Sequence, residues 1–166
     1  IYSATLDQYT GPITIRYPRG NCLGLTLPDE FKSIEKGKAE RLSRGSDIAV
    51  LSIGTIGNQV IKAIEMLGQD SSKVSHYNMR FLRPLDTEAV KEAASGHKVI
   101  ITVEDGCVIG GLYGAVCEAL ANEGTSCRIF GMGIPDKFIE QGTVPEQLKE
   151  CGIDAESICR AMKYFF

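Results

Sequence analysis

Two arginines near the start of the chain have the residue type and the setting to bind a phosphate group. Arg16 and Arg19 belong to the stretch Arg-Tyr-Pro-Arg-Gly, at the end of an alternating apolar run over residues 13–17 that predicts a strand. A guanidinium donates two parallel hydrogen bonds to a phosphate, and a proline-stiffened backbone has little entropy left to lose on binding. A salt bridge between domains would use the same charges, so the chemistry alone leaves both interpretations open.

A pair of carboxylates, Glu104 and Asp105, follows the apolar β-branched run that starts at Val99 and precedes Gly110-Gly111. Such a pair could act as a general acid and base or as metal ligands. Carboxylates beside the amino terminus of a following helix also serve as helix caps or dipole partners. Because no second carboxylate or histidine cluster lies close by in the sequence, we favour the structural role.

A glycine loop and two histidines are further candidates. The loop Gly54-Thr55-Ile56-Gly57 lies between a predicted strand and a predicted helix, where backbone N–H groups can bind phosphate. It lacks the lysine and the further glycines of the nucleotide-binding patterns, so a tight turn without a ligand is favoured. His76 and His97 have no Ser, Cys or carboxylate partner placed by the sequence, and a structural role is favoured over catalysis.

The cysteines show no metal-binding or disulfide pattern. They lack a Cys-x-x-Cys pair and histidines at ligand spacing, which fits small core residues in a reducing cytoplasm better than a secreted disulfide scaffold. The six positions are Cys22, Cys107, Cys117, Cys127, Cys151 and Cys159.

Apolar runs alternate with stretches of helical periodicity, and this order predicts an α/β fold built on a mostly parallel sheet. Residues 38–43, a turn at 44–46 and residues 48–53 resemble a hairpin, which would add one antiparallel edge strand. Asp86, the Thr143/Glu146 capping box and Asp154 predict helix starts. The other parallel strands are expected at residues 73–79, from Val99 onward and at residues 127–132.

Composition limits the classes of partner. The chain has 166 residues, 43% of them hydrophobic, and a net charge of −3 from interspersed residues of both signs. No basic block suggests nucleic acid, and no run is long and apolar enough to span a membrane. Residues 22–36 lose all periodicity, so we expect residues 1–35 to be the tail of one domain plus a linker, and residues 36–166 to form a second domain.

Several motifs together resemble the 1-deoxy-D-xylulose-5-phosphate synthases, thiamine-diphosphate enzymes related to transketolase. Their order and spacing cover nearly the whole chain. The motifs are Ile15-Arg16-Tyr17-Pro18-Arg19-Gly20, Asn78-Met79-Arg80-Phe81-Leu82-Arg83-Pro84-Leu85-Asp86, Val103-Glu104-Asp105-Gly106 with Gly110-Gly111, and Gly133-Ile134-Pro135-Asp136-Lys137-Phe138-Ile139-Glu140-Gln141-Gly142.

The resemblance implies a C-terminal fragment of such an enzyme. Residues 1–35 would be the tail of the pyrimidine-binding domain plus a linker, and residues 36–166 a transketolase-type C-terminal domain, a three-layer fold whose mixed sheet has one antiparallel edge strand. The full enzyme would condense pyruvate with glyceraldehyde 3-phosphate, as a cytoplasmic homodimer with thiamine diphosphate and Mg²⁺. Arg19 would bind the aldehyde's phosphate, with Arg16 in support, and Glu104 and Asp105 would be structural.

The resemblance also implies limits. The family's Gly-Asp-Gly motif with its later Asn, its catalytic histidines and its glutamate for the aminopyrimidine are not found in this sequence. We therefore expect no catalytic residue, no bound metal or cofactor, and no activity of this fragment alone. A transketolase or the β subunit of a 2-oxo acid dehydrogenase is an alternative within the superfamily, and a non-catalytic interaction module is an alternative outside it.

Overall fold

The computed structural model describes residues 2–7, 9–15, 17 and 29–166. The chain divides into two compact units, residues 1–36 and residues 37–166.

The smaller unit begins with a short helix, α1 (Tyr2–Leu6). Its serine hydroxyl, Ser3 Oγ, accepts a hydrogen bond from the Ile34 backbone N–H at 2.7 Å. The rings of Tyr2 and Phe31 lie 5.8 Å apart. The strand predicted over residues 13–17 is wrong for the described residues 13–15 and 17, because no strand among the described residues of this unit pairs with them.

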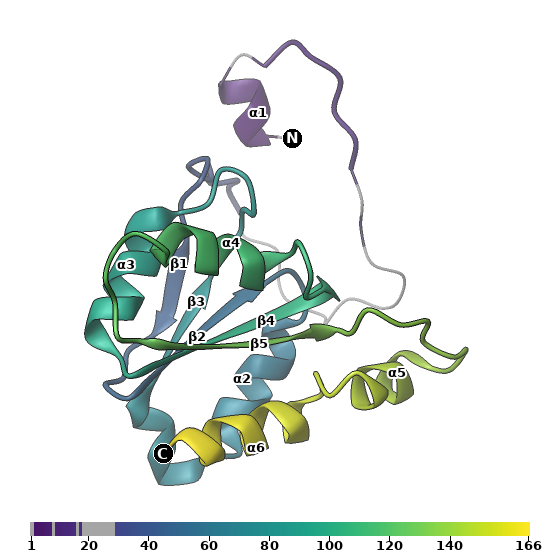
Figure 1. Ribbon diagram of the computed structural model, residues 1–166. Coiled ribbons are helices and arrows are strands. Elements are labelled where there is room, and N and C mark those ends of the chain that lie inside the picture. Colours follow the sequence, from purple (N-terminus) through teal and green to yellow (C-terminus); the bar gives the residue numbers. More distant parts are fainter. Residues whose placement is uncertain (1, 8, 16, 18–28) are drawn as a thin grey trace. The chain divides into compact units, whose positions relative to one another are not determined.

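The larger unit is a three-layer α/β fold (Figure 1). Its five-stranded sheet has the order β1-β3-β2-β4-β5, with β1 antiparallel to β3 and all other neighbours parallel. This confirms the predicted fold class. The strands are β1 (Glu40–Ser43), β2 (Ile48–Ile53), β3 (Val74–Asn78), β4 (Val99–Cys107) and β5 (Arg128–Ile134).

Helices cover both faces of the sheet. The helices α2, α5 and α6 pack over one apolar cluster, and α3 and α4 pack over the other. A 3₁₀ helix, η1 (Gly68–Lys73), leads into β3. The helices are α2 (Gly57–Glu65), α3 (Thr87–Gly96), α4 (Leu112–Leu120), α5 (Val144–Glu150) and α6 (Ala155–Phe165).

The predicted hairpin is wrong in its pairing, although the antiparallel edge strand is confirmed. β1 pairs with β3 and not with β2, which follows it directly. Residues Ile48 to Leu51 in β2 are fully buried, backbone included, so β2 lies in the interior of the sheet with a strand on each side. The crossovers through α2 and α3 supply β3 and β4 for these places, and the remaining edge beside β3 is taken by β1.

Three helices begin directly after the capping residues that the sequence predicts. Asp86 Oδ1 accepts from the Ala89 backbone N–H at 3.1 Å, and Glu146 Oε2 accepts from the Thr143 backbone N–H at 2.8 Å in a capping box. Asp154 occupies the N-cap position of α6. The first N–H of that helix, on Ala155, donates to the Gln59 side chain of α2 at 3.2 Å, and this bond ties α6 to its neighbour.

Candidate functional site

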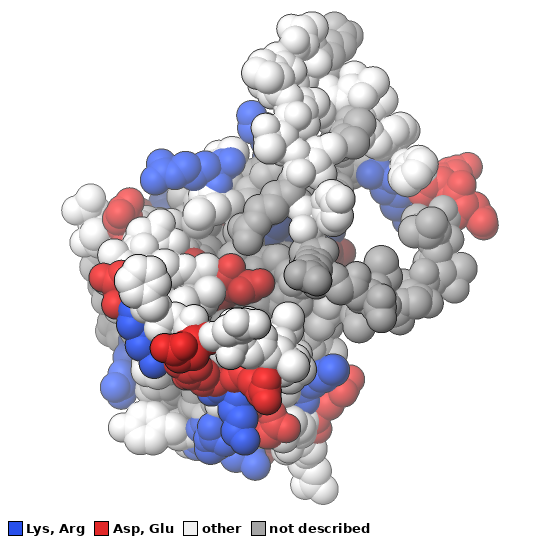
Figure 2. All heavy atoms as spheres, turned by 90° about the vertical axis from the view of Figure 1, so that its right-hand side faces the viewer, with Lys and Arg blue, Asp and Glu red and all other residues white. Residues whose placement is uncertain are grey.

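The carboxyl ends of the four parallel strands meet at one edge of the sheet, where α/β folds place their functional loops. The loop after β2 contains Gly54 and Gly57, and the loop after β4 contains Gly110 and Gly111. In Figure 2, which faces the side toward which β4 and β5 point in Figure 1, acidic and basic side chains lie next to one another. A functional site at this edge requires a side chain or backbone group that is free to bind a ligand.

Glu104 is a buried helix cap. It lies in β4, and its carboxylate accepts hydrogen bonds from the backbone N–H groups of Leu112 at 2.8 Å and Tyr113 at 3.1 Å, in the first turn of α4. N–H groups in the first turn of a helix have no acceptor within the helix, so the Glu104 carboxylate supplies the acceptor that they lack. The structural role favoured from the sequence is confirmed for Glu104.

Two glycines make room for this carboxylate. A Cβ atom on Gly111 would overlap Glu104 Oε2, and a Cβ atom on Gly133 would lie 2.9 Å from Glu104 Cγ. Neither contact is compatible with a real side chain, so both positions have to be glycine for Glu104 to keep its place. Gly111 lies close to Glu104 in the sequence, whereas Gly133 lies in β5 and its role was missed by sequence reasoning.

Asp105 does not form an acid–base pair with Glu104. Successive side chains of a strand point to opposite faces, and Asp105 is exposed whereas Glu104 is buried. The negative charge of Asp105 contributes, after burial and Glu150, to a raised pKa of the Cys151 thiol. The two carboxylates therefore have different surroundings and no common substrate position.

The loop after β2 uses its backbone N–H groups internally. Gly57 N–H donates to the Gly54 carbonyl at 3.2 Å, Asn58 N–H to the Thr55 carbonyl at 3.1 Å, and Gln59 N–H to the Ile56 carbonyl at 2.9 Å. Gly54 has φ of +83°, a conformation that glycine adopts without strain. These bonds support the tight turn favoured from the sequence over a phosphate-binding loop.

The structure brings His76 into contact with a serine that the sequence did not single out. His76 Nε2 lies 2.8 Å from Ser52 Oγ, and both side chains are about 1% exposed. Burial lowers the pKa of His76 to about 4. A Ser–His pair can activate a nucleophile, but this one is closed to solvent and no carboxylate is hydrogen-bonded to the ring among the described residues, so the pair is structural.

His97 also has structural partners. Its Nδ1 lies 2.9 Å from the Ala93 carbonyl oxygen, and its Nε2 lies 2.9 Å from Ser75 Oγ and 3.2 Å from the Gly45 carbonyl oxygen. The ring joins the end of α3 to the turn before β2 and to β3. This confirms the structural role favoured for this histidine.

The five described cysteines are free thiols, and among them Cys159 is buried. The prediction that most of the cysteines are core residues is therefore wrong for the other four described cysteines. Burial raises the pKa of the Cys127 and Cys151 thiols, which keeps them protonated and weakly nucleophilic at neutral pH. Cys22 lies outside the described residues. The raised pKa of Cys127 and Cys151 argues against a nucleophilic role for these two thiols.

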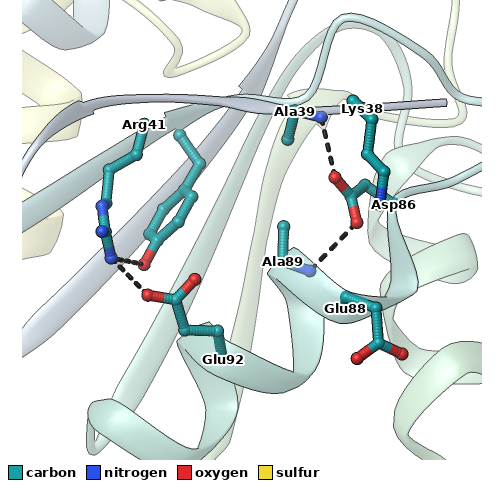
Figure 3. A pocket seen from close by; sticks show the side chains of 8 residues that line it. Lys38, Ala39, Arg41, Asp86, Glu88, Ala89 and Glu92 are labelled. Carbon is teal, nitrogen blue, oxygen red and sulfur yellow. Dashed lines mark hydrogen bonds and ion pairs between the residues drawn. The ribbon is translucent and has the colours of Figure 1, made fainter. Parts of the chain in front are cut away.

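A surface pocket of about 430 Å³ lies between β1 and α3 (Figure 3). Arg41 binds Glu92 and lies 3.5 Å from the Tyr77 hydroxyl, and Asp86 accepts hydrogen bonds from the backbone N–H groups of Ala39 at 2.9 Å and Ala89. Hydrogen bonding to Tyr77 and the charge of Glu92 raise the pKa of Arg41. These bonds hold β1 against α3. Arg41, Asp86 and Glu92 are therefore bonded to other groups of the protein.

Arg16 and Arg19, the predicted phosphate-binding residues, lie outside the described residues. Within the described ranges, no group of three or more His, Cys, Asp or Glu side chains could hold a metal ion. None of the helices there has the length and apolar character that a membrane crossing requires. Among the described residues, the carboxylate of Glu104 is thus engaged as a helix cap and is not free to bind a ligand.

Comparison with known proteins gives the wider context. Residues 37–158 match the family described as transketolase, C-terminal domain. A protein of Parabacteroides distasonis named 1-deoxy-D-xylulose-5-phosphate synthase is 45% identical over 155 residues, which are 93% of this chain and 24% of that protein. Synthases of the same name from Cytophaga hutchinsonii and Porphyromonas gingivalis are 41% and 44% identical over 98% and 90% of this chain. The chain spans about a quarter of the length of these relatives.

A solved structure described as "Split gene transketolase, inactive beta4 tetramer" matches with a TM-score of 0.73 and 27% identity, over 84% of this chain and 46% of that chain. A transketolase from Campylobacter jejuni matches with a TM-score of 0.55 at 16% identity, over 78% of this chain and 19% of that chain, which supports the fold alone.

Proposed function

The chain belongs to the family of transketolase C-terminal domains, and from this premise we propose that it is the C-terminal part of a 1-deoxy-D-xylulose-5-phosphate synthase. The synthase condenses pyruvate with glyceraldehyde 3-phosphate, with loss of carbon dioxide. The observation that carries the proposal is the identity of 41–45% to three proteins of this name, over 90–98% of this chain. Transketolase itself is the nearest alternative, because the fold is shared.

We propose that residues 1–35 are the tail of the pyrimidine-binding domain plus a linker, and that residues 36–166 are the C-terminal domain. The exposed apolar side chains of the smaller unit support this division. Tyr17 is 83% exposed and Phe31 is 76% exposed, as expected for residues that pack against a larger domain. Thiamine diphosphate and Mg²⁺ would bind to the remainder of the enzyme; in support, no group of three or more His, Cys, Asp or Glu side chains among the described residues could hold a metal ion.

We further propose a homodimer in the cytoplasm. The split-gene relative is described as a β4 tetramer, an assembly of copies of one chain, and this supports self-association of the fold. The free thiols of the described cysteines support a reducing compartment.

For Arg19 we propose direct binding of the aldehyde's phosphate, with Arg16 in support. The test is a chimera in which this chain replaces the matching quarter of the Parabacteroides distasonis relative, with the same quarter from Porphyromonas gingivalis as the positive control. The chimera should release carbon dioxide from pyruvate when glyceraldehyde 3-phosphate is present. In it, Arg19→Ala should raise KM for the aldehyde by about tenfold to a hundredfold, since charge-assisted hydrogen bonds are lost.

Thiamine diphosphate affinity and KM for pyruvate should not change in the Arg19→Ala chimera. Arg44→Ala, an arginine of the exposed turn after β1, is the matched control and should leave KM for the aldehyde unchanged. An unchanged KM in Arg19→Ala would make this residue structural. A folded chimera that turns over transketolase substrates but not pyruvate would overturn the synthase proposal.

A further inference from the structure

We propose that Arg80, Asp86 and Glu40 are positioning residues of the synthase, a role that rests on the function proposed above. They hold the first residues of the larger unit against the turn after β3, and so fix the point at which the chain enters this unit. Arg80 and Asp86 belong to the motif at residues 78–86, and Glu40 is the first residue of β1. We call these contacts, which all lie within residues 37–166, the entry clamp.

Arg80 has a backbone conformation that an arginine seldom adopts. Its φ is +56°, and among the described residues no other residue except glycine has a positive φ. The Arg80 N–H donates to Asn78 Oδ1 at 3.2 Å, and the Phe81 N–H donates to the Met79 carbonyl on the other side of the turn. Met79 is fully buried, and its N–H donates to the Ser52 carbonyl at 2.8 Å. The sheet therefore anchors a strained turn, and strain that glycine would avoid points to a role for the arginine side chain.

The Arg80 guanidinium reaches the start of β1. It forms an ion pair with Glu40, which is also the residue opposite Asn78 in the ladder between β1 and β3. The two side chains are 29% and 46% exposed, and an ion pair this close to solvent contributes little to the free energy of unfolding. What the ion pair adds is a fixed place for the first residue of β1.

Asp86 holds the preceding residue on the same turn. One carboxylate oxygen caps α3, and the other accepts a hydrogen bond from the Ala39 N–H at 2.9 Å (Figure 3). Asp86 is 8% exposed, so water competes poorly for this bond. One step further along the turn, Pro84 lies against Gly37, where a Cβ atom would be 2.8 Å from Pro84 Cγ. Three contacts with one turn thus fix the chain from Gly37 to Glu40.

The position of this entry matters because the connection to the smaller unit is short. The N–H of Ile34 donates to Ser3 Oγ at 2.7 Å, so the smaller unit holds the chain up to that residue. Glu35 and Lys36, both exposed, are the residues that separate Ile34 from Gly37. Three residue steps span at most about 11 Å, too little to absorb a large displacement at the clamp. We expect such a displacement to be passed on to residues 1–36, the part of the chain that includes position 19.

Amide hydrogen exchange of the purified 166-residue chain tests the entry clamp without any activity. Asn caps a helix about as well as Asp, so Asp86→Asn should keep the first turn of α3 and lose the bond to Ala39. In Asp86→Asn and in Arg80→Gly, the Ala39 amide should exchange about tenfold faster, while the Ala89 amide stays protected. Unchanged exchange at Ala39 would overturn the clamp. Equal loss of protection at Ala89 would also overturn it, because the contacts would then serve only to hold α3.

The positioning role is tested in the chimera with the Parabacteroides distasonis relative. Small misplacements of substrate-positioning groups slow catalysis, so Arg80→Gly should lower kcat about tenfold. Its melting temperature should stay within about 2 °C, since glycine adopts this φ without strain. Arg80→Lys keeps the charge and should recover most of kcat. Lys91→Ala, which removes the similarly exposed ion pair of Lys91 with Glu123, is the matched control and should leave kcat unchanged.

The outcomes separate this role from the synthase function. An active chimera whose kcat is not changed by Arg80→Gly would overturn the positioning role and leave the synthase function standing. A lower melting temperature with an unchanged kcat per folded enzyme would make Arg80 a stabilising residue only. A folded chimera that is inactive before any substitution would overturn the synthase function, and the positioning role with it.

Discussion

The two outer strands, β1 and β5, are held on the same sheet by different means. β1 has four residues and an irregular register, and its side chains form ion pairs, Arg41 with Glu92 and Glu40 with Arg80. β5 has seven residues, and its Gly133 packs against the buried side chain of Glu104 in the adjacent strand β4. A short edge strand with two charged residues out of four resists pairing with another strand more than a longer edge strand whose one charged residue, Arg128, lies at its start.

The contrast shows where the stability of each edge originates. At β1 the contacts are ionic and close to solvent, so screening by water and salt weakens them. At β5 the contact centres on a carboxylate that is 4% exposed and fully engaged with α4. We therefore expect substitutions at Glu104, which packs against β5, to lower the free energy of unfolding strongly. Substitutions in β1 should lower it only slightly.

Among single substitutions at neutral pH, the largest effect is expected for Glu104→Gln. The amide keeps the shape of the side chain but can accept at one oxygen only, and its NH₂ group then faces a backbone N–H that has lost its acceptor. The free energy of unfolding should fall by about 2–3 kcal/mol, the cost of an unsatisfied buried donor and a lost charge-assisted hydrogen bond. Urea denaturation measures this change.

Glu118→Gln is the control for Glu104→Gln, because Glu118 lies on α4 itself but is exposed. It should be as stable as the unmodified chain. Equal stability of both variants and the unmodified chain would show that the cap contributes nothing, and the contrast between the two edges would then lose its physical basis.

A second effect concerns pH and should arise beside β1, at His76 of β3. The pKa of this side chain is about 4 in the folded chain, because burial disfavours the charged imidazolium, against 6.5 for the ordinary value. Between these values the unfolded chain binds more protons. The contribution of the neutral His76 to the free energy of unfolding is therefore fully present above pH 6.5 and decreases as the pH is lowered. It is lost as the pH falls through about 4, and the difference is about 3 kcal/mol.

Urea denaturation between about pH 7 and pH 4 tests the His76 effect by comparing the unmodified chain with His76→Gln. Carboxylates titrate in both proteins, so the difference between the two pH profiles isolates the histidine. The unmodified chain should lose more stability than the variant over this range. Parallel profiles would show that the imidazole charges without cost in the folded chain.

Sequence reasoning predicted what is local in the chain. The strands, the helix caps at Asp86 and Thr143, and the capping role of Glu104 all depend on residues within about ten positions of one another. The pairing of β1 with β3 was mispredicted because it depends on where two crossover helices place β3 and β4. The contacts of Ser52 with His76 and of Gly133 with Glu104 were missed because they join different strands, whose register no local pattern specifies.

The smallest effect is expected at β1, for Arg41→Ala. The guanidinium is partly exposed, and its partner Glu92 is more so, which allows water to replace the ion pair. The melting temperature should fall by about 2 °C or less at low salt, and the difference should shrink further at high salt because the Debye length shortens. The Glu104→Gln effect should stay unchanged by salt, since its partners are uncharged backbone N–H groups. If Arg41→Ala instead destabilised the chain as strongly as Glu104→Gln at high salt, β1 would be held by the contact of the Arg41 guanidinium with the Tyr77 ring and not by its ion pair with Glu92.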